Sequence, residues 1–404
     1  MNKLTIGNAT IYAGNNLEVL PTLADNSIDS IVCDPPYELG FMGKSWDNSG
    51  IAYNVELWKE CFRVLKPGGH LLAFGGTRTW HRLAVAIEDA GFEIRDNIAW
   101  LYGSGFPKSH NISKAIDKMY GAEREVVGSR IADDIRGGNL HAENRGERHT
   151  INITVSATDD AKAWDGWGTA LKPAHEPIVV ARKPVIGTIA ENVLTYGVGA
   201  INIDATRIGF ASEEDLVEYD FNNNGQNRST KEDGESLEVH NGGWKVQKGQ
   251  KSMPAGRWPA NIILDEYTAQ VLDEQSGASR FFYVAKANKR DRNEGLDELP
   301  IQRPDLRTST GMGTFEEKGV QPQRNFHPTV KPTALMQYLI RLVTPENGVV
   351  LDPFCGSGST GKAAILEGKH FIGIELTEEY LPIIAGRLQH ATETINLKED
   401  DLFD

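Results

Sequence analysis

The stretch Gly348-Val-Val-Leu-Asp-Pro-Phe-Cys-Gly-Ser-Gly-Ser-Thr-Gly-Lys362 is the part of the sequence that decides the fold. Its beginning, Gly348 to Leu351, is a short apolar run typical of a buried strand, and a glycine-rich loop follows shortly after it. The residues from Thr360 to Glu367 then have helical spacing. A strand, a glycine-rich loop and a helix in this order are typical of α/β domains, in which ligands bind at the positively polarised start of the helix.

The glycines of this loop fit two patterns that bind nucleotides. The dinucleotide pattern G-x-G-x-x-G is satisfied by Gly356, Gly358 and Gly361. The phosphate-loop pattern G-x-x-x-x-G-K is largely satisfied as well, but Ala363 stands where that loop requires a serine or threonine hydroxyl for magnesium. The sequence therefore argues against ATP or GTP and leaves a dinucleotide open.

An acidic residue at the start of the loop favours a third ligand, S-adenosylmethionine. Asp352 ends the predicted strand, and a carboxylate there attracts a ligand with an amino group and a sulfonium but repels a pyrophosphate. Glu375 ends the next predicted strand, where an acid can bind the ribose of either a dinucleotide or S-adenosylmethionine. Pro353 and Phe354 add a rigid, apolar wall. The loop therefore favours the methyl donor, with a dinucleotide or a purely structural turn as alternatives.

A second motif, Asp34-Pro-Pro-Tyr37, follows another predicted buried strand, Ser27 to Cys33. It should therefore lie at the carboxyl edge of the sheet, where ligand clefts of α/β proteins form. An exocyclic amine of adenine or cytosine is a poor nucleophile because its lone pair is delocalised into the ring. The carboxylate of Asp34 and the carbonyl of Pro35 can accept its two protons, and Tyr37 offers a flat face for a base removed from the helix. A proline-rich turn without catalytic function is the alternative.

Strands and helices alternate at both ends of the chain. Apolar runs predict strands at 27–33, 70–74, 92–101, 348–351 and 370–374. Helical spacing predicts helices at 53–65, 79–90, 335–343, 360–367 and 377–388. Such alternation indicates an α/β domain with a mostly parallel sheet that is covered on both faces. Between about 125 and 325 the pieces are shorter and more polar, and we expect 221–254 to be a loop or an insertion.

The composition limits the classes of protein to which the chain can belong. No apolar run in its 404 residues approaches the roughly 18 to 20 residues of a membrane span, and its first residues lack the apolar core of a secretory signal. We therefore expect a cytoplasmic protein with no membrane partner. The three cysteines, Cys33, Cys61 and Cys355, fit neither a disulfide framework nor a zinc cluster, so we expect no metal.

Together the two motifs resemble the amino-methyltransferases of DNA, in the class whose catalytic segment precedes the cofactor segment. The run from Asp34 to Tyr37 matches the catalytic motif of that family. Asp352-Pro-Phe, the glycine-rich loop and Glu375 match its cofactor-binding half. The segment His327-Pro-Thr-Val-Lys-Pro332 resembles the family segment that helps to hold the methionine end of the donor.

This resemblance covers about 1–115 and 325–390, and it implies a circularly permuted Rossmann-like methyltransferase fold with a mostly parallel seven-stranded sheet and an inserted recognition region. It implies S-adenosylmethionine as cofactor and the N6 amine of adenine, in double-stranded DNA, as target. The N4 amine of cytosine is the alternative, less favoured because cytosine members more often carry serine in place of Asp34. The residues implied to act in catalysis are Asp34, Pro35, Pro36 and Tyr37. Those implied to bind the cofactor are Asn15, Thr329, Lys331, Asp352, Pro353, Phe354, Cys355, Gly356, Ser357, Gly358, Glu375 and Leu376.

Asn15 departs from the family pattern. Many members carry an aspartate after a glycine ahead of the catalytic strand, whereas this chain has Gly14-Asn15. The adenine amine of the donor would then meet an amide oxygen, which accepts a hydrogen bond more weakly than a carboxylate does.

The resemblance also implies a division of the chain into four parts. We expect a catalytic half at 1–120, an inserted target-recognition region at 121–325, a cofactor-binding half at 326–395 and an acidic tail at 396–404. In the recognition region, aromatic and cationic residues at 164–177 and 256–261 are candidates to stack on bases or to read groove edges. The residues at 100–111 are expected to line the pocket of the target base.

The charge of the chain is the feature that fits DNA least well. Its net charge of −14 opposes phosphate binding, although basic residues gather at 286–292 and 303–331. The resemblance implies a bacterial protein, or one that is encoded by a phage and acts in the host cytoplasm. A homodimer and a restriction endonuclease partner are compatible with it. Two functions of other classes stay open, a nicotinamide-dependent oxidoreductase and a non-enzymatic DNA-binding protein that keeps a donor site for regulation.

Overall fold

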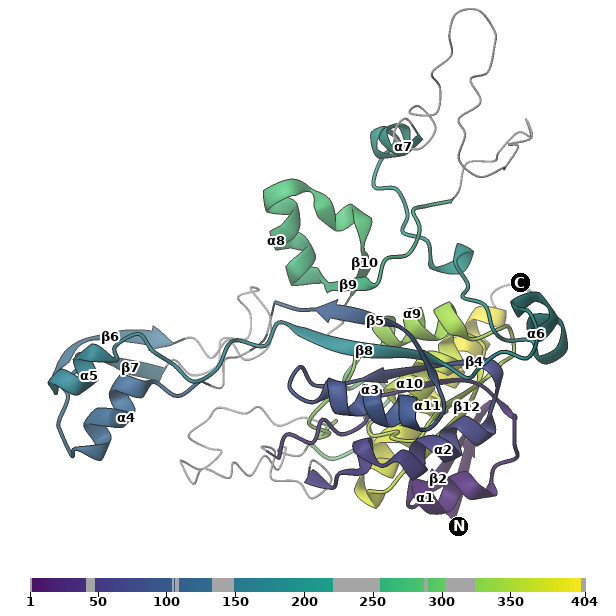
Figure 1. Cartoon of the computed structure of the whole chain (residues 1–404), viewed down its shortest axis with the longest axis horizontal. Coiled ribbons are helices and arrows are strands. Elements are labelled where there is room, and N and C mark those ends of the chain that lie inside the picture. Colours follow the sequence, from purple (N-terminus) through teal and green to yellow (C-terminus); the bar gives the residue numbers. More distant parts are fainter. Residues whose placement is uncertain are drawn as a thin grey trace, which may run out of the picture.

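The centre of the molecule is a mixed ten-stranded sheet, in a computed structural model that describes residues 2–40, 48–103, 105, 109–132, 149–220, 255–286, 290–301 and 324–400 (Figure 1). Its strand order is β1-β2-β12-β11-β3-β4-β8-β5-β9-β10. Neighbouring strands are parallel except at β1, which is antiparallel to β2, and at β8, which is antiparallel to both β4 and β5. The strands are β1 (Asn2–Ile6), β2 (Ala9–Ala13), β3 (Ile28–Cys33), β4 (Leu65–Phe74), β5 (Glu93–Leu101), β8 (His175–Arg182), β9 (Ile262–Asp265), β10 (Tyr283–Ala285), β11 (Val349–Asp352) and β12 (His370–Glu375).

The α/β class and the mostly parallel sheet are confirmed, but the expected number of seven strands is wrong. All five strands predicted individually are present as β3, β4, β5, β11 and β12. Strands β8, β9 and β10 come from the region 121–325, which is therefore built into the sheet and is not a simple insertion. The four-residue apolar run Ile178–Ala181 of β8 is as long as the runs that predict other strands, but it lies in a region whose pieces are mostly short and polar, so the sequence does not single it out. The circular permutation stays a prediction.

Helices cover both faces of the sheet (Figure 1). One layer holds α9 (Thr333–Val343), α10 (Ser359–Leu366) and α11 (Leu381–Asp400), and the other holds α1 (Asn16–Val19), α2 (Val55–Val64) and α3 (Trp80–Asp89). Strand β4 points Leu72 and Phe74 into the hydrophobic core under α9, α10 and α11. It points Leu71 and Ala73 into the core under α1, α2 and α3, as expected for a strand buried on both sides. Short 3₁₀ helices lie at Leu20–Thr22, Ile51–Tyr53, Asp204–Thr206, Ala278–Phe281 and Glu378–Tyr380.

A small lobe projects beyond the ends of β5 and β8, at the left of Figure 1. It consists of α4 (Ile112–Met119), β6 (Val126–Ala132), β7 (His149–Thr154) and α5 (Asp159–Ala163). Asp117 holds it together, because its buried carboxylate accepts hydrogen bonds from Arg124 at 2.6 Å and from the Thr158 hydroxyl at 2.8 Å. The remaining helices are α6 (Ile189–Tyr196), which contacts β4, α7 (Glu213–Asp220), and α8 (Glu266–Ser276), which contacts β9 and β10.

Parts of the predicted loops and basic stretches fall outside the described residues. They are Lys108, the loop 221–254, Lys289, Arg303, Arg307, Lys318 and the end of the predicted acidic tail, 401–404. Within the described parts of the chain, every helix is too short or too polar to cross a lipid bilayer.

Candidate active site

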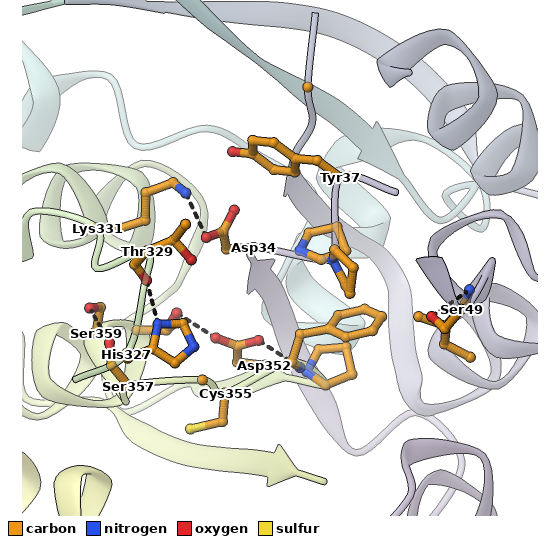
Figure 2. Close-up of a pocket in the computed structure, with 18 of the residues that line it drawn as sticks. Asp34, Tyr37, Ser49, His327, Thr329, Lys331, Asp352, Cys355, Ser357 and Ser359 are labelled. Carbon is orange, nitrogen blue, oxygen red and sulfur yellow. Dashed lines mark hydrogen bonds and ion pairs between the residues drawn. The ribbon is translucent and has the colours of Figure 1, made fainter. Parts of the chain in front are cut away.

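A cavity of about 1250 Å³ lies at the carboxyl ends of β2, β3, β4, β11 and β12 (Figure 2). These strands are parallel, so their ends meet at one edge of the sheet and bring together segments that are far apart in the sequence. A pocket for one small ligand measures roughly 300 to 1,000 Å³, so this cavity is large enough to hold a second molecule or group beside such a ligand. Of the predicted site residues, all except Gly358 line it: Asn15, Asp34, Pro35, Pro36, Tyr37, Thr329, Lys331, Asp352, Pro353, Phe354, Cys355, Gly356, Ser357, Glu375 and Leu376.

Two carboxylates stand side by side at the ends of β11 and β12. Asp352 accepts hydrogen bonds from the Phe354 amide at 2.9 Å and from the Thr360 hydroxyl at 2.6 Å. Glu375 accepts hydrogen bonds from the Gly356 amide at 2.7 Å and from the Thr377 amide at 2.8 Å. The two acids thus fix both the beginning of the glycine-rich loop and its position against the next strand.

Both carboxylates are held in an environment that disfavours their charge. Burial raises the pKa of Asp352 to about 7, although hydrogen bonds from Thr360 and Phe354 oppose the shift. Burial likewise raises the pKa of Glu375 to about 7, against hydrogen bonds from Thr377 and Gly356. Among the described residues, no lysine or arginine forms a salt bridge with either acid. This part of the cavity is therefore suited to a ligand that brings a positive charge.

The glycines of the loop have different tasks. Gly356 has a φ of +55°, and a Cβ there would lie 3.0 Å from Nε2 of His327, so a side chain would be both strained and in contact with the ring. Gly358 has a φ of +74° at the start of α10, and a Cβ there would meet Ile384 and Leu388 of α11 at 3.2 Å. Gly358 therefore allows two helices to pack and does not line the cavity, contrary to its expected role in cofactor binding.

Lys362 points away from the cavity, which removes the phosphate-loop interpretation. Its ammonium group is buried and bonded to Asp291 and to Glu294, at 2.8 Å in each case. A phosphate-loop lysine has to face the ligand. Beside it, the fully buried Arg387 donates to the carbonyl of Ser357 at 2.9 Å and supports the loop from behind.

Asp34 directly follows β3 and forms an ion pair across the cavity. Its Oδ2 accepts from Nζ of Lys331 at 2.5 Å (Figure 2). Its Oδ1 is buried and has no hydrogen-bond partner among the described residues. An unpartnered buried carboxylate oxygen is costly, so its presence at a cavity indicates an acceptor that is kept for a ligand.

Lys331 was expected to hold the donor, but its ammonium group lies on the Tyr37 side of the cavity. Besides Asp34, it faces Oε2 of Glu176 at 3.5 Å, and it lies 5.3 Å from the centre of the Tyr37 ring. Burial works against its charge, but Asp34 and Glu176 outweigh burial and raise the pKa of the lysine. The lysine is therefore charged and shared between two carboxylates.

Tyr37 is fixed by its hydroxyl group. The phenol donates to Oε2 of Glu176 at 2.7 Å. Burial and the nearby charges of Asp34 and Glu176 raise the pKa of Tyr37 well above its usual value, so the phenol keeps its proton. In Figure 2 Tyr37 and Asp34 lie above Asp352 and Cys355. The cavity thus has one side formed by the catalytic motif and one formed by the glycine-rich loop.

The segment before α9 joins these two sides. Burial lowers the pKa of His327 to about 3, so its ring is neutral. Its Nδ1 lies 2.7 Å from the carbonyl of Thr329 and must carry the proton, which leaves Nε2 as an acceptor beside Gly356. Thr329 lines the cavity as predicted.

Asn15 lines the cavity, but its amide oxygen already has a structural task. It accepts from the Leu17 amide at 3.0 Å and caps α1. The neighbouring Asn16 donates to the carbonyl of Pro353 at 3.2 Å and ties α1 to the glycine-rich loop. The contact of Asn15 with the donor stays a prediction.

The sequence did not single out Glu176 and Tyr380 as residues of the cavity, and it pointed to His327 only as part of the segment 327–332. Glu176 lies in the stretch 164–177, which the sequence analysis interprets as a base-reading segment. In that stretch, Trp164 and Trp167 contact each other in the lobe and do not line the cavity. Within 100–111, Tyr102 is the described residue that lines the cavity. For Glu176, the one signal in the sequence was the alternation of residues along β8, which places Glu176 on the same face of the strand as the buried Ile178.

Comparisons with known proteins identify the family to which the chain is similar. A family model described as DNA methylase matches residues 28–386. The type II methyltransferase M.HindIII of Haemophilus influenzae is 25% identical over 83% of this chain and 68% of its own length. The DNA adenine methyltransferase YhdJ of Escherichia coli K12 is 46% identical over a shorter match, 16% of this chain and 22% of its own. The solved PvuII DNA methyltransferase, which is cytosine-N4-specific, superposes with a TM-score of 0.46 and 14% identity over 97% of this chain and 93% of its own.

Proposed function

The chain belongs to the DNA methylase family whose model matches residues 28–386, and we propose that its target is the N6 amine of adenine. Its activity is thereby the transfer of a methyl group from S-adenosylmethionine to an amine of a DNA base. The choice of adenine is supported by Asp34 at the first position of the catalytic run, where the cytosine members more often have serine, and by the name of the relative YhdJ. The single observation that carries the amine chemistry is the buried, unpartnered Oδ1 of Asp34.

The residues of the glycine-rich side fit S-adenosylmethionine. When bound, this donor supplies an electrophilic methyl group attached to a positively charged sulfur. Asp352 and Glu375 would compensate that charge, and Glu375 would in addition accept from the ribose hydroxyls. Pro353 and Phe354 would pack against the apolar parts of the donor. A pyrophosphate would instead meet two acids without a cation, which disfavours the oxidoreductase alternative.

The catalytic side offers the contacts that an amine of a base requires. Asp34 Oδ1 and the carbonyl of Pro35 would accept its two N–H bonds, which moves the nitrogen lone pair out of the ring and towards an incoming methyl group. The same oxygen of Asp34 is placed to receive the proton that the amine must lose. Tyr37, held by Glu176, would stack on the flat face of the base after the base has left the helix.

The product of the reaction tests this assignment. We expect N6-methyladenine in DNA that was incubated with the purified protein and S-adenosylmethionine, digested to nucleosides and analysed by mass spectrometry. Detection of N4-methylcytosine would mean that the target is cytosine and not adenine, and it would leave the assignment of the donor site unchanged. DNA without any methylated base would overturn the proposed activity. In thermal melting, S-adenosylmethionine should stabilise the protein and NAD should not.

We also expect S-adenosylmethionine to bind more weakly as the pH falls below about 7. Asp352 and Glu375 have pKa values of about 7, so below that pH each carries a proton that must leave before a cationic ligand binds. Each such proton raises the dissociation constant by up to about tenfold per pH unit. Titration calorimetry in buffers of different ionisation enthalpy measures the released protons, and Glu375→Gln should lower their number. An affinity that does not change between about pH 5.5 and about pH 8.5 would contradict this expectation.

Target recognition is proposed for parts of the region 121–325. Ala170, Leu171 and Pro173 line the cavity and connect it to the lobe of α4, β6, β7 and α5. The lobe carries Trp164 and Trp167, which are 46% and 58% exposed and available to contact bases. Long-read mapping of methylated DNA would give the target sequence. A homodimer and a restriction endonuclease partner stay proposals from the family, and a cytoplasmic location is proposed on the same ground.

A further inference from the structure

Glu176 connects the parts of the base site, although it belongs to neither of the two motifs. It lies on β8, the antiparallel strand between β4 and β5. Its Oε2 accepts the hydrogen bond of the Tyr37 phenol at 2.7 Å and faces Nζ of Lys331 at 3.5 Å. One carboxylate oxygen therefore touches both the ring that would stack on the base and the cation that pairs with Asp34.

Lys331 has two anionic partners and very little water. Its side chain is 8% exposed, and those of Asp34 and Glu176 are each 20% exposed. The ammonium group lies over the rings of Tyr37 and Phe74, 5.3 Å and 4.9 Å from their centres. With so little solvent, the position of this charge depends on the two carboxylates.

The ion pair leaves Asp34 with one oxygen for a ligand. Lys331 occupies Oδ2, and Oδ1 is buried without a partner among the described residues. If Glu176 lost its charge, Asp34 would be the one counter-ion left to Lys331 among the residues that the structure describes. The lysine would then move closer to Asp34 and draw negative charge away from Oδ1, while Tyr37 would keep at most a neutral hydrogen bond.

We propose that Glu176 is a positioning residue of the base site, which fixes the ring of Tyr37 and shares Lys331 so that Asp34 keeps a charged acceptor for the target amine. This rests on the proposed function. Glu176 touches neither the amine nor the methyl group in this role. It acts through Tyr37 and through Lys331.

Two variants separate the two contacts. Glu176→Gln keeps the size of the side chain but not its charge, so it weakens the contact with Lys331 and leaves the Tyr37 phenol at most a neutral hydrogen bond. Tyr37→Phe removes only the hydroxyl group that donates a hydrogen bond to Glu176. Glu88→Gln, at an exposed position of α3 away from the cavity, is the matched control for the loss of one negative charge. For each variant, the kcat, the affinity for S-adenosylmethionine by calorimetry and the stability in urea are compared with those of the wild type.

We expect Glu176→Gln to lower kcat about 100-fold, the loss that a misplacement of about 1 Å brings, with the donor affinity unchanged. Tyr37→Phe combined with Glu176→Gln should lose less activity than the product of the single losses, because both act on the same ring. In urea, Glu176→Gln combined with Lys331→Met should be destabilised by less than the sum of the single variants. Glu88→Gln should behave as the wild type.

Activity of Glu176→Gln within about twofold of the wild type, or fully multiplicative losses, would overturn the role of Glu176 while the methyltransferase activity stands. The role would also be overturned if Glu176→Gln lost donor affinity and stability in the same proportion as kcat, because Glu176 would then be merely structural. A wild type that methylates no DNA base would overturn the proposed function and this role with it, even where the urea experiment shows the contact with Lys331.

Discussion

Asp34→Ala should reduce the methylation of DNA about 1,000-fold while S-adenosylmethionine still binds with its normal affinity. The loss is the size expected when the one charged acceptor of a reacting group is removed from a site with little water. Among the described residues that line the cavity, Asp34 is the one with a buried carboxylate oxygen, Oδ1, that has no hydrogen-bond partner. The glycine-rich side does not change, since Asp352 and Glu375 make none of their hydrogen bonds to Asp34.

The measurement is tritium transfer from the labelled donor to DNA, together with calorimetry of donor binding. Lys331 keeps Glu176 as a partner in this variant, so the fold should tolerate the change. Asp34→Asn adds a second comparison, because the amide keeps the shape of the side chain but not its charge. Asp89→Ala, an exposed aspartate at the end of α3, is the control. Unchanged methylation by Asp34→Ala would show that the Asp-Pro-Pro-Tyr run is not catalytic, as a non-enzymatic DNA-binding protein requires.

Glu375→Ala should have the opposite pattern, with a dissociation constant for S-adenosylmethionine that is raised about 100-fold and a kcat near normal at saturating donor. The variant removes the acid expected to accept from the ribose and also the acceptor of the Gly356 and Thr377 amides. Hydrogen bonds to a charged group contribute about 1.5 to 3 kcal/mol each, so the loss of one or two accounts for this factor.

Calorimetry with S-adenosylmethionine and kinetics at several donor concentrations measure this separation of binding from turnover. Glu379→Ala, four residues further and exposed, is the matched control. If Glu375→Ala bound the donor normally, the ligand would not lie against the end of β12. A normal dissociation constant combined with a lost kcat would place Glu375 on the catalytic side.

The sequence by itself determined which residues lie at the edge of the sheet. Asp34, Asp352 and Glu375 each stand at the end of an apolar run, and the carboxyl ends of parallel strands meet at one edge. The five predicted helices and the five predicted strands are all present, because each is a local pattern of apolar residues. The family resemblance rests on the same local runs.

Only the tertiary structure decided what these residues contact. Glu176 lies 139 positions from Tyr37, and Lys331 lies 297 positions from Asp34, so no local pattern relates them. Their contacts depend on β8 entering the sheet between β4 and β5 and running antiparallel to both. Lys362 shows the same limit, since the loop pattern directs it at a ligand and the fold directs it at Asp291 and Glu294. A pattern along the chain determines where a strand ends. The order of the strands follows from packing the whole sheet, and that order determines which charged side chains come into contact.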